Sequence, residues 1–216
     1  MRATDPVALA LALGVFSLVP LLIITATSFL KIAIVLALIR NALGVQQAPP
    51  NIAIYALALL LTIYIMAPVG AEIGNAISTE SSEELSVQSM AGQIRLGAEP
   101  VRKFLLANTD AEQRRFFMDR ARELWPPAFS ATITEEDLLI VMPAFVVSEL
   151  TDAFQIGFLL YMPFIVIDLV ISNILMAMGM MMVSPVTISL PLKLFLFVMV
   201  DGWSRLLHGL IQTYTL

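Results

Sequence analysis

The sequence predicts an all-α membrane protein, and three observations lead to this fold class. Hydrophobic residues make up 59% of the 216 residues and charged residues only 13%, whereas a soluble domain would carry about 25%. The apolar residues fall in uncharged runs that are long enough to cross a bilayer as helices. Of the 29 charged residues, 19 lie between Glu72 and Asp137, so a polar insert separates two apolar halves.

The first apolar run is longer than a simple membrane span. It carries no charge from Pro6 to Leu30 and, past Lys31, continues to Ala42. A straight helix of this length would measure roughly 55 Å, whereas the hydrocarbon core is about 30 Å thick. The run is therefore interpreted as a retained helix rather than a signal peptide, with a kink at Pro20 and a part that packs against protein outside the bilayer.

Residues 1–74 together are predicted to form an apolar helical hairpin. Gly44 and the consecutive Pro49 and Pro50 break the first helix. The uncharged run 51–71 then forms the second helix of the hairpin.

The polar insert, residues 75–134, is predicted to be a small helical domain outside the membrane. Its mixed charges are interpreted as a solvated face, and Trp125-Pro126-Pro127 ends its second helical segment. Lys31, Arg40 and Lys193 lie beside the apolar runs, so the connections near them should be cytoplasmic and the insert should face the opposite side.

The C-terminal apolar region, residues 135–216, is predicted to contain two long helices. Thr134 to Asp137 resemble a capping box ahead of a helix from Glu135 to Tyr161. Met162-Pro163 marks a kink, and a final helix is expected from Val186 to Tyr214.

Seven charged residues lie inside apolar runs, where they are costly and face protein or water. Two interpretations remain open: the charges neutralise one another between helices or subunits, or Glu149 and Asp152 belong to a proton path. The spacing of Asp201 and Arg205 predicts an i,i+4 pair. The seven are Lys31, Glu149, Asp152, Asp168, Lys193, Asp201 and Arg205.

Several kinds of chemistry find no support in the sequence. There is no P-loop, no GxSxG and no HExxH motif, and no cysteine. The single histidine, His208, has no second histidine or cysteine with which to hold a metal. The net charge of −5 argues against nucleic acid. We expect no catalytic residue, metal or cofactor.

Two long stretches, Thr27 to Pro68 and Met142 to Trp203, closely resemble the FliP/SctR (YscR/HrcR-like) family of type III secretion export-gate proteins. This resemblance implies a pentamer of kinked helical hairpins in a pseudo-helical export gate of the bacterial inner membrane, with a periplasmic insert. It implies FliQ/SctS-type, FliR/SctT-type, SctU/FlhB-type and SctV/FlhA-type partners, and unfolded secreted proteins as substrates. The short leader and the sequence after Met182 favour the injectisome, virulence-associated branch over the flagellar one.

Five methionines fall between Met176 and Met182. The resemblance assigns Met180, Met181 and Met182 to a gasket around the pore, and flexible, polarizable side chains suit a seal that must fit varied chains. Packing of a methionine-rich helix end against neighbouring subunits is the alternative. The loop is expected to bend at Gly179, Ser184 and Pro185.

Two other functions compete with a conducting gate subunit. An ion-coupled small-molecule transporter would carry inverted repeats and broken helices around a midplane site, and no repeat is evident between the halves. A scaffold that only nucleates the secretion base is also compatible with the family resemblance.

Overall fold

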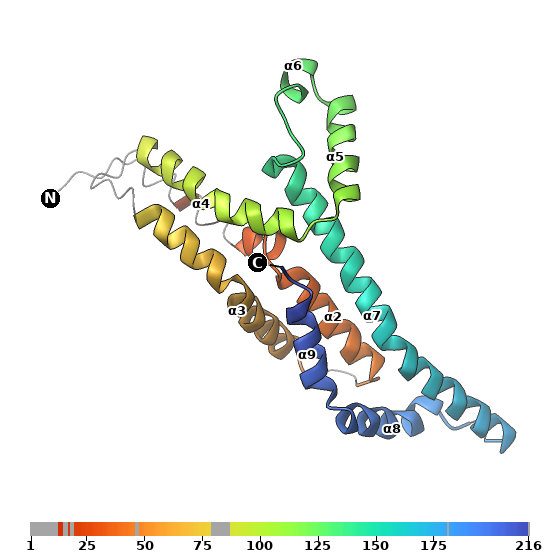
Figure 1. Ribbon diagram of the computed structural model, residues 1–216. Helices are drawn as coiled ribbons and strands as arrows, with labels where there is room; N and C mark the ends of the chain where they lie inside the picture. Colours follow the sequence, from red (N-terminus) through yellow and green to blue (C-terminus); the bar gives the residue numbers. More distant parts are fainter. Residues whose placement is uncertain are drawn as a thin grey trace. The chain divides into compact units, whose positions relative to one another are not determined.

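The computed structural model describes residues 13–14, 17, 20–45, 48–78, 87–180 and 182–215. Every regular element in these ranges is a helix, which confirms the predicted all-α class (Figure 1). The elements are α2 (Phe29–Ala42), α3 (Asn51–Ser78), α4 (Val87–Ala107), α5 (Ala111–Leu124), α6 (Pro127–Ser130), α7 (Leu138–Ala177), α8 (Pro185–Met199) and α9 (Gly202–Gln212).

Two of these helices, α3 and α7, are long and apolar enough to cross a membrane. The bent pair of α8 and α9 would supply a third span if its two helices act as one. With 40 residues, α7 is about 60 Å long, twice the thickness of a hydrocarbon core of about 30 Å. A hydrocarbon core of this thickness would cover only about half the length of α7.

The interruption of the first apolar run lies at residues 26–28. The backbone is helical over residues 20–25 and again from Phe29. Thr25 donates its hydroxyl to the Leu21 carbonyl at 2.9 Å, and Thr27 Oγ1 accepts the Phe29 N–H at 3.3 Å. Hydroxyls that bond to nearby backbone compete with the helical pattern, so this Thr-rich segment ends one helix and begins the next. Residues 18 and 19, before Pro20, lie outside the described residues.

The insert contains α4, α5 and α6. Met118 and Ala121 of α5 form a buried cluster with Ile140, against which Phe117, Trp125 and Ile133 pack. As predicted, α5 ends at Leu124, and Trp125 is its C-cap. Arg102 hydrogen-bonds to the Glu99 carboxylate at 2.8 and 2.9 Å, and this bond lowers the pKa of Glu99 from its ordinary value.

The long helix α7 begins three residues later than predicted. The Asp137 carbonyl accepts the Val141 N–H at 2.9 Å, so Asp137 is the N-cap. Its carboxylate accepts the Thr134 N–H at 2.6 Å and the Thr134 hydroxyl at 3.1 Å. The predicted hydrogen bond between Thr134 and Asp137 exists, but it closes the loop before the helix. At Met162-Pro163 the helix continues without a break.

The prediction of one final helix from Val186 to Tyr214 is wrong. The chain forms α8 and α9, which are bent by 62° relative to each other (Figure 1). Asp201 adopts a left-handed conformation with φ of 56°, which does not continue a right-handed helix. A Cβ on the next residue, Gly202, would lie 2.3 Å from the Phe197 ring. The bend therefore requires a glycine at this position.

The chain divides into two compact units. One contains residues 1–30, 62–149 and 215–216, and the other contains residues 31–61 and 150–214. Both α3 and α7 run through both units. The predicted boundaries after residues 74 and 134 separate the polar insert from the two apolar regions, and they stay a prediction.

Candidate functional site: the methionine loop and the buried charges

The methionine loop begins where α7 ends at Ala177. The Met180 N–H donates to the Leu175 carbonyl at 2.9 Å, and the Gly179 N–H donates to the Met176 carbonyl at 3.0 Å. These two bonds define a Schellman motif with Gly179 at the left-handed position, φ 73°. The helix thus ends inside the methionine run, and Met180 does not continue the helical face of Met176.

The side chains of the loop are left in the open by this turn. Met180 is 40% exposed and Met182 is fully exposed, at 101%. Ser184 is the N-cap of α8, and Pro185 occupies its first turn, where a proline costs no hydrogen bond. The predicted bend residues therefore lie at the two helix ends that frame the loop, while Met181 lies outside the described residues.

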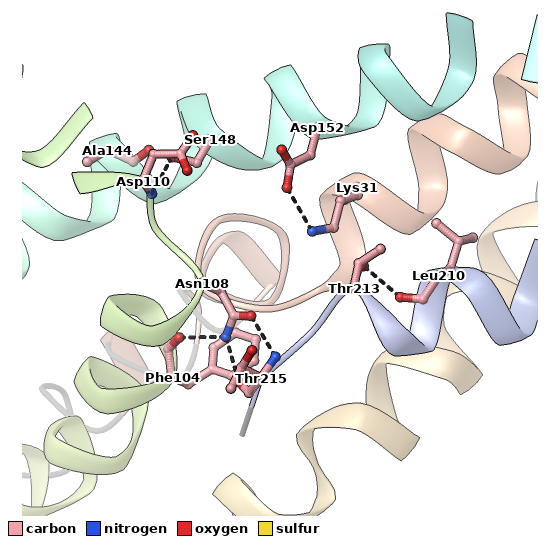
Figure 2. Close-up of polar contacts among 10 residues, drawn as sticks. All are labelled: Lys31, Phe104, Asn108, Asp110, Ala144, Ser148, Asp152, Leu210, Thr213 and Thr215. Atoms are coloured by element: carbon pink, nitrogen blue, oxygen red, sulfur yellow. Dashed lines mark hydrogen bonds and ion pairs between the residues drawn. The ribbon is translucent and has the colours of Figure 1, made fainter. Parts of the chain in front are cut away.

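Lys31 is one of two buried lysines that connect helices of the second unit. This α2 residue is 1% exposed. Its ammonium lies 3.2 Å from the Asp152 carboxylate of α7 (Figure 2). The same ammonium lies 4.1 Å from the centroid of the Tyr214 ring, a cation–π distance. Lys31 thereby joins α2, α7 and the segment after α9.

Lys193 of α8 is the second buried lysine, 4% exposed. Its ammonium lies 2.5 Å from the Asp168 carboxylate of α7 and donates to the Ala42 carbonyl of α2 at 3.3 Å. Ser189, one turn earlier, donates its hydroxyl to the other Asp168 oxygen at 2.6 Å. The charge is neutralised within the chain, and the lysine also satisfies a carbonyl at the end of α2.

The other three charges do not share this arrangement. Among the described residues there is no ion pair between Asp201 and Arg205, because Asp201 is the left-handed N-cap of α9 rather than a helical residue. The predicted i,i+4 pair is therefore wrong. Glu149 is fully buried and lies one turn before Asp152 on α7.

In the first unit, Asn108 binds the backbone of Thr215 through two hydrogen bonds that the sequence did not predict. We call this pair of hydrogen bonds the clasp. Asn108, just after α4, donates its amide to the Thr215 carbonyl at 2.8 Å and accepts the Thr215 N–H at 3.0 Å (Figure 2). The Asp110 N–H donates to Ser148 Oγ at 3.1 Å, and Ser148 donates to the Ala144 carbonyl at 3.0 Å. The position of Asn108 just after a helix indicates that its side chain could bind backbone groups. Its partner could not be predicted, because it lies 107 residues away.

Replacing Asn108 with alanine is expected to release the end of the chain. The Thr215 amide loses its hydrogen-bond acceptor, which contributes about 1 kcal/mol. Its hydrogen exchange should therefore become about fivefold faster, as measured by NMR or mass spectrometry. The amide of Thr213 bonds to the Leu210 carbonyl and serves as the internal control. Unchanged exchange at Thr215 would contradict the clasp.

Fold and site together define an all-helical membrane protein whose buried lysines are paired with carboxylates and whose methionine loop is exposed. In the part of the chain that the structure describes, no group of three or more potential ligands is placed to hold a metal. The chain belongs to the FliP family, which matches residues 12–210.

Proteins with similar sequences support this membership along the whole chain. The chain is 51% identical over 214 residues to Yop proteins translocation protein R of Yersinia pestis, covering 99% of each. It is 47% identical over 210 residues to harpin secretion protein HrcR of Erwinia amylovora, covering 97% of each. It is 48% identical over 221 residues to the probable translocation protein y4yL of Sinorhizobium fredii, covering 100% of this chain and 98% of that one.

Proposed function

We propose that this chain is a non-catalytic, pore-forming subunit of a type III secretion export gate. In this role it conducts unfolded proteins across the bacterial inner membrane. The support comes from the family and from relatives of nearly equal length that are named as secretion and translocation proteins. The names of these relatives favour the injectisome branch.

The observation that carries the proposal is the exposed methionine loop. A core-packing role would bury these side chains against their own chain, yet Met180 and Met182 face outward from a turn. Thioether side chains are flexible and polarizable, so a ring of them can close against itself and deform around an extended chain. Such a ring requires several copies, and a pentamer would provide them.

The buried ion pairs connect the helices that precede and follow the methionine loop to each other and to α2. Asp168 is bound by Lys193 and Ser189, and Asp152 by Lys31. Each of these carboxylates is therefore engaged by an ammonium of its own chain rather than left open to a transported ion. This is an argument against the ion-coupled transporter.

The basic residues suggest the orientation of the chain in the membrane, and its exposed apolar helices suggest where partners bind. The connections near Arg40 and Lys193 are placed in the cytoplasm and the insert, α4 to α6, in the periplasm, following the positions of the basic residues. The exposed apolar surfaces of α3 and α7 would contact lipid and the FliQ/SctS-type, FliR/SctT-type, SctU/FlhB-type and SctV/FlhA-type subunits.

Replacing Met180, Met181 and Met182 together with alanine is the decisive test of the gasket. The shorter side chains leave the constriction open, so cells carrying the assembled system should show a several-fold faster ion leak, measured with an intracellular pH indicator after an external acid shift. The control replaces Met176 and Met178, which are also exposed, and it should stay tight. An ion-tight triple variant with normal assembly would refute the gasket.

Crosslinking distinguishes a conduit from a scaffold. The chain has no cysteine, so Met182→Cys creates the only thiol. With a stalled substrate in the assembled system, a cysteine at position 182 should crosslink to the substrate and one at position 176 should not. Failure at position 182, with crosslinking at other subunits, would leave the scaffold as the better interpretation.

A further inference from the structure

A cavity lined by described residues lies at the connection between α2 and α3. Its volume is about 630 Å³, and it is bordered by Arg40, Asn41, Gly44, Pro50, Asn51 and Val186. Among the described residues of this lining, Arg40 is the only charged one. A cavity whose described lining contains one cation and no acid is suited to an anion.

The hydrogen bonds of Arg40 leave its charge uncompensated. One guanidinium nitrogen, Nη1, donates to the Pro49 carbonyl at 3.4 Å and to Asn51 Oδ1 at 2.5 Å, and both acceptors are neutral. Neither Nη2 nor Nε has a hydrogen bond among the described residues. A guanidinium has five donors in a planar fork that matches a phosphate. These contacts hold the guanidinium in place while donors remain for a ligand.

No acid of the surrounding elements compensates this charge. Residues 31–61, which include the connection and the start of α3, contain no aspartate or glutamate, and neither do residues 183–200. A second cation, the Lys193 ammonium, lies 4.0 Å from the position that a Cβ on Gly44, a lining residue, would take. Its charge is already paired with Asp168 at 2.5 Å. The described lining of the cavity therefore carries the net positive charge of Arg40.

The position of the cavity indicates which anion it binds. It lies at the first residue of α3, a helix that is long and apolar enough to cross a membrane. Just beyond the cavity, Ile52 and Tyr55 of α3 are exposed, at 78% and 52%. A phospholipid has this same order of groups, with a phosphate at the helix end and acyl chains along the apolar surface.

We propose that this cavity binds the phosphate of an anionic phospholipid, held by the Arg40 guanidinium, with the acyl chains along the outer surface of α3. The inference is independent of the secretion role proposed above. It concerns the lipid that surrounds the chain, whether the chain conducts protein or only supports assembly.

The test counts lipids bound to the full-length chain, extracted from membranes with the subunits that copurify with it. Native mass spectrometry after addition of phosphatidylglycerol should detect one retained lipid per chain, which phosphatidylcholine does not replace. Arg40→Gln should lower its occupancy about fivefold, since one basic residue contributes about 1 kcal/mol to anionic lipid binding. Arg40→Lys should retain part of it. The exposed cation Lys103 of α4, replaced by glutamine, serves as the control.

A second variant tests the site without removing Arg40, in case Arg40→Gln itself prevents folding. Val186→Glu keeps the guanidinium and adds a carboxylate to the cavity lining, so it should also exclude the lipid. Equal phosphatidylglycerol occupancy in wild type, Arg40→Gln and Val186→Glu would overturn the proposal. Displacement of the lipid by an equal concentration of glycerol phosphate would overturn it too, because the site would then belong to a soluble phosphate.

Discussion

Replacing Lys193 with alanine is expected to lower the free energy of unfolding by about 3 kcal/mol. The ammonium is buried, pairs with Asp168 at 2.5 Å and also donates to the Ala42 carbonyl. Removing one partner of a buried pair leaves the other charge uncompensated, at a cost of about 3–5 kcal/mol. The lower end of this range applies because the Asp168 side chain is 37% exposed, so water still solvates part of its charge. Unfolding in a denaturing detergent series would measure the loss.

A double variant separates lost charge pairing from lost packing at this site. Lys193→Met with Asp168→Asn removes both charges and keeps similar volumes, and such replacements of buried pairs are often nearly neutral. The double variant should therefore be more stable than Lys193→Met alone. If the two are equally unstable, the pair contributes little and the packing of the lysine stem accounts for the effect.

Replacing Gly202 with alanine is the second substitution expected to have a large effect. The new Cβ would lie 2.3 Å from two carbons of the Phe197 ring. This ring is 6% exposed and contacts Phe164 and Trp203, with centroids 6.4 and 5.4 Å away, so it has little room to move. Overpacking of this kind costs about 1–3 kcal/mol. The unfolding midpoint should fall accordingly.

Gly209 of the same helix provides the matched control. A Cβ there meets no atom within 4 Å, and alanine in a helix interior is favoured over glycine by about 0.5–1 kcal/mol. Gly209→Ala should therefore be neutral or slightly stabilising. Phe197→Ala should relieve the clash, so that Gly202→Ala costs less in that background. The same loss in both backgrounds would show that the steric explanation is incorrect.

Most of the helices could be predicted from hydrophobic runs and helix-breaking residues. Long apolar runs indicated α3 and α7, and Trp125-Pro126 marked the end of α5. These signals are local, because a proline or a run of apolar side chains acts on its own turn of the chain. The bend between α8 and α9 could not be predicted in this way. Its cause is the left-handed conformation of Asp201 together with the Phe197 ring, which lies five residues before Gly202.

The buried charges show the same difference between what the sequence predicts and what depends on tertiary packing. Each was recognisable as a costly charge in an apolar run, and neutralisation within the protein was one of two interpretations. The partners were not recognisable: Lys31 pairs with a residue 121 positions away, and the one pair predicted from spacing, Asp201 with Arg205, does not form. Sequence spacing predicts contacts only along one helix, whereas these pairs join different helices.

The sequence by itself determined that this protein is an all-helical membrane protein with a charged insert, because long runs with few charges are compatible with lipid and the charge-rich segment between them is not. Two long stretches of the sequence, Thr27 to Pro68 and Met142 to Trp203, also identified the family. The tertiary structure decided which carboxylate neutralises each lysine, where α7 ends within the methionine run, and why glycine is required at position 202. These outcomes depend on distances between segments that are far apart in the chain, and such distances exist only after the helices have packed.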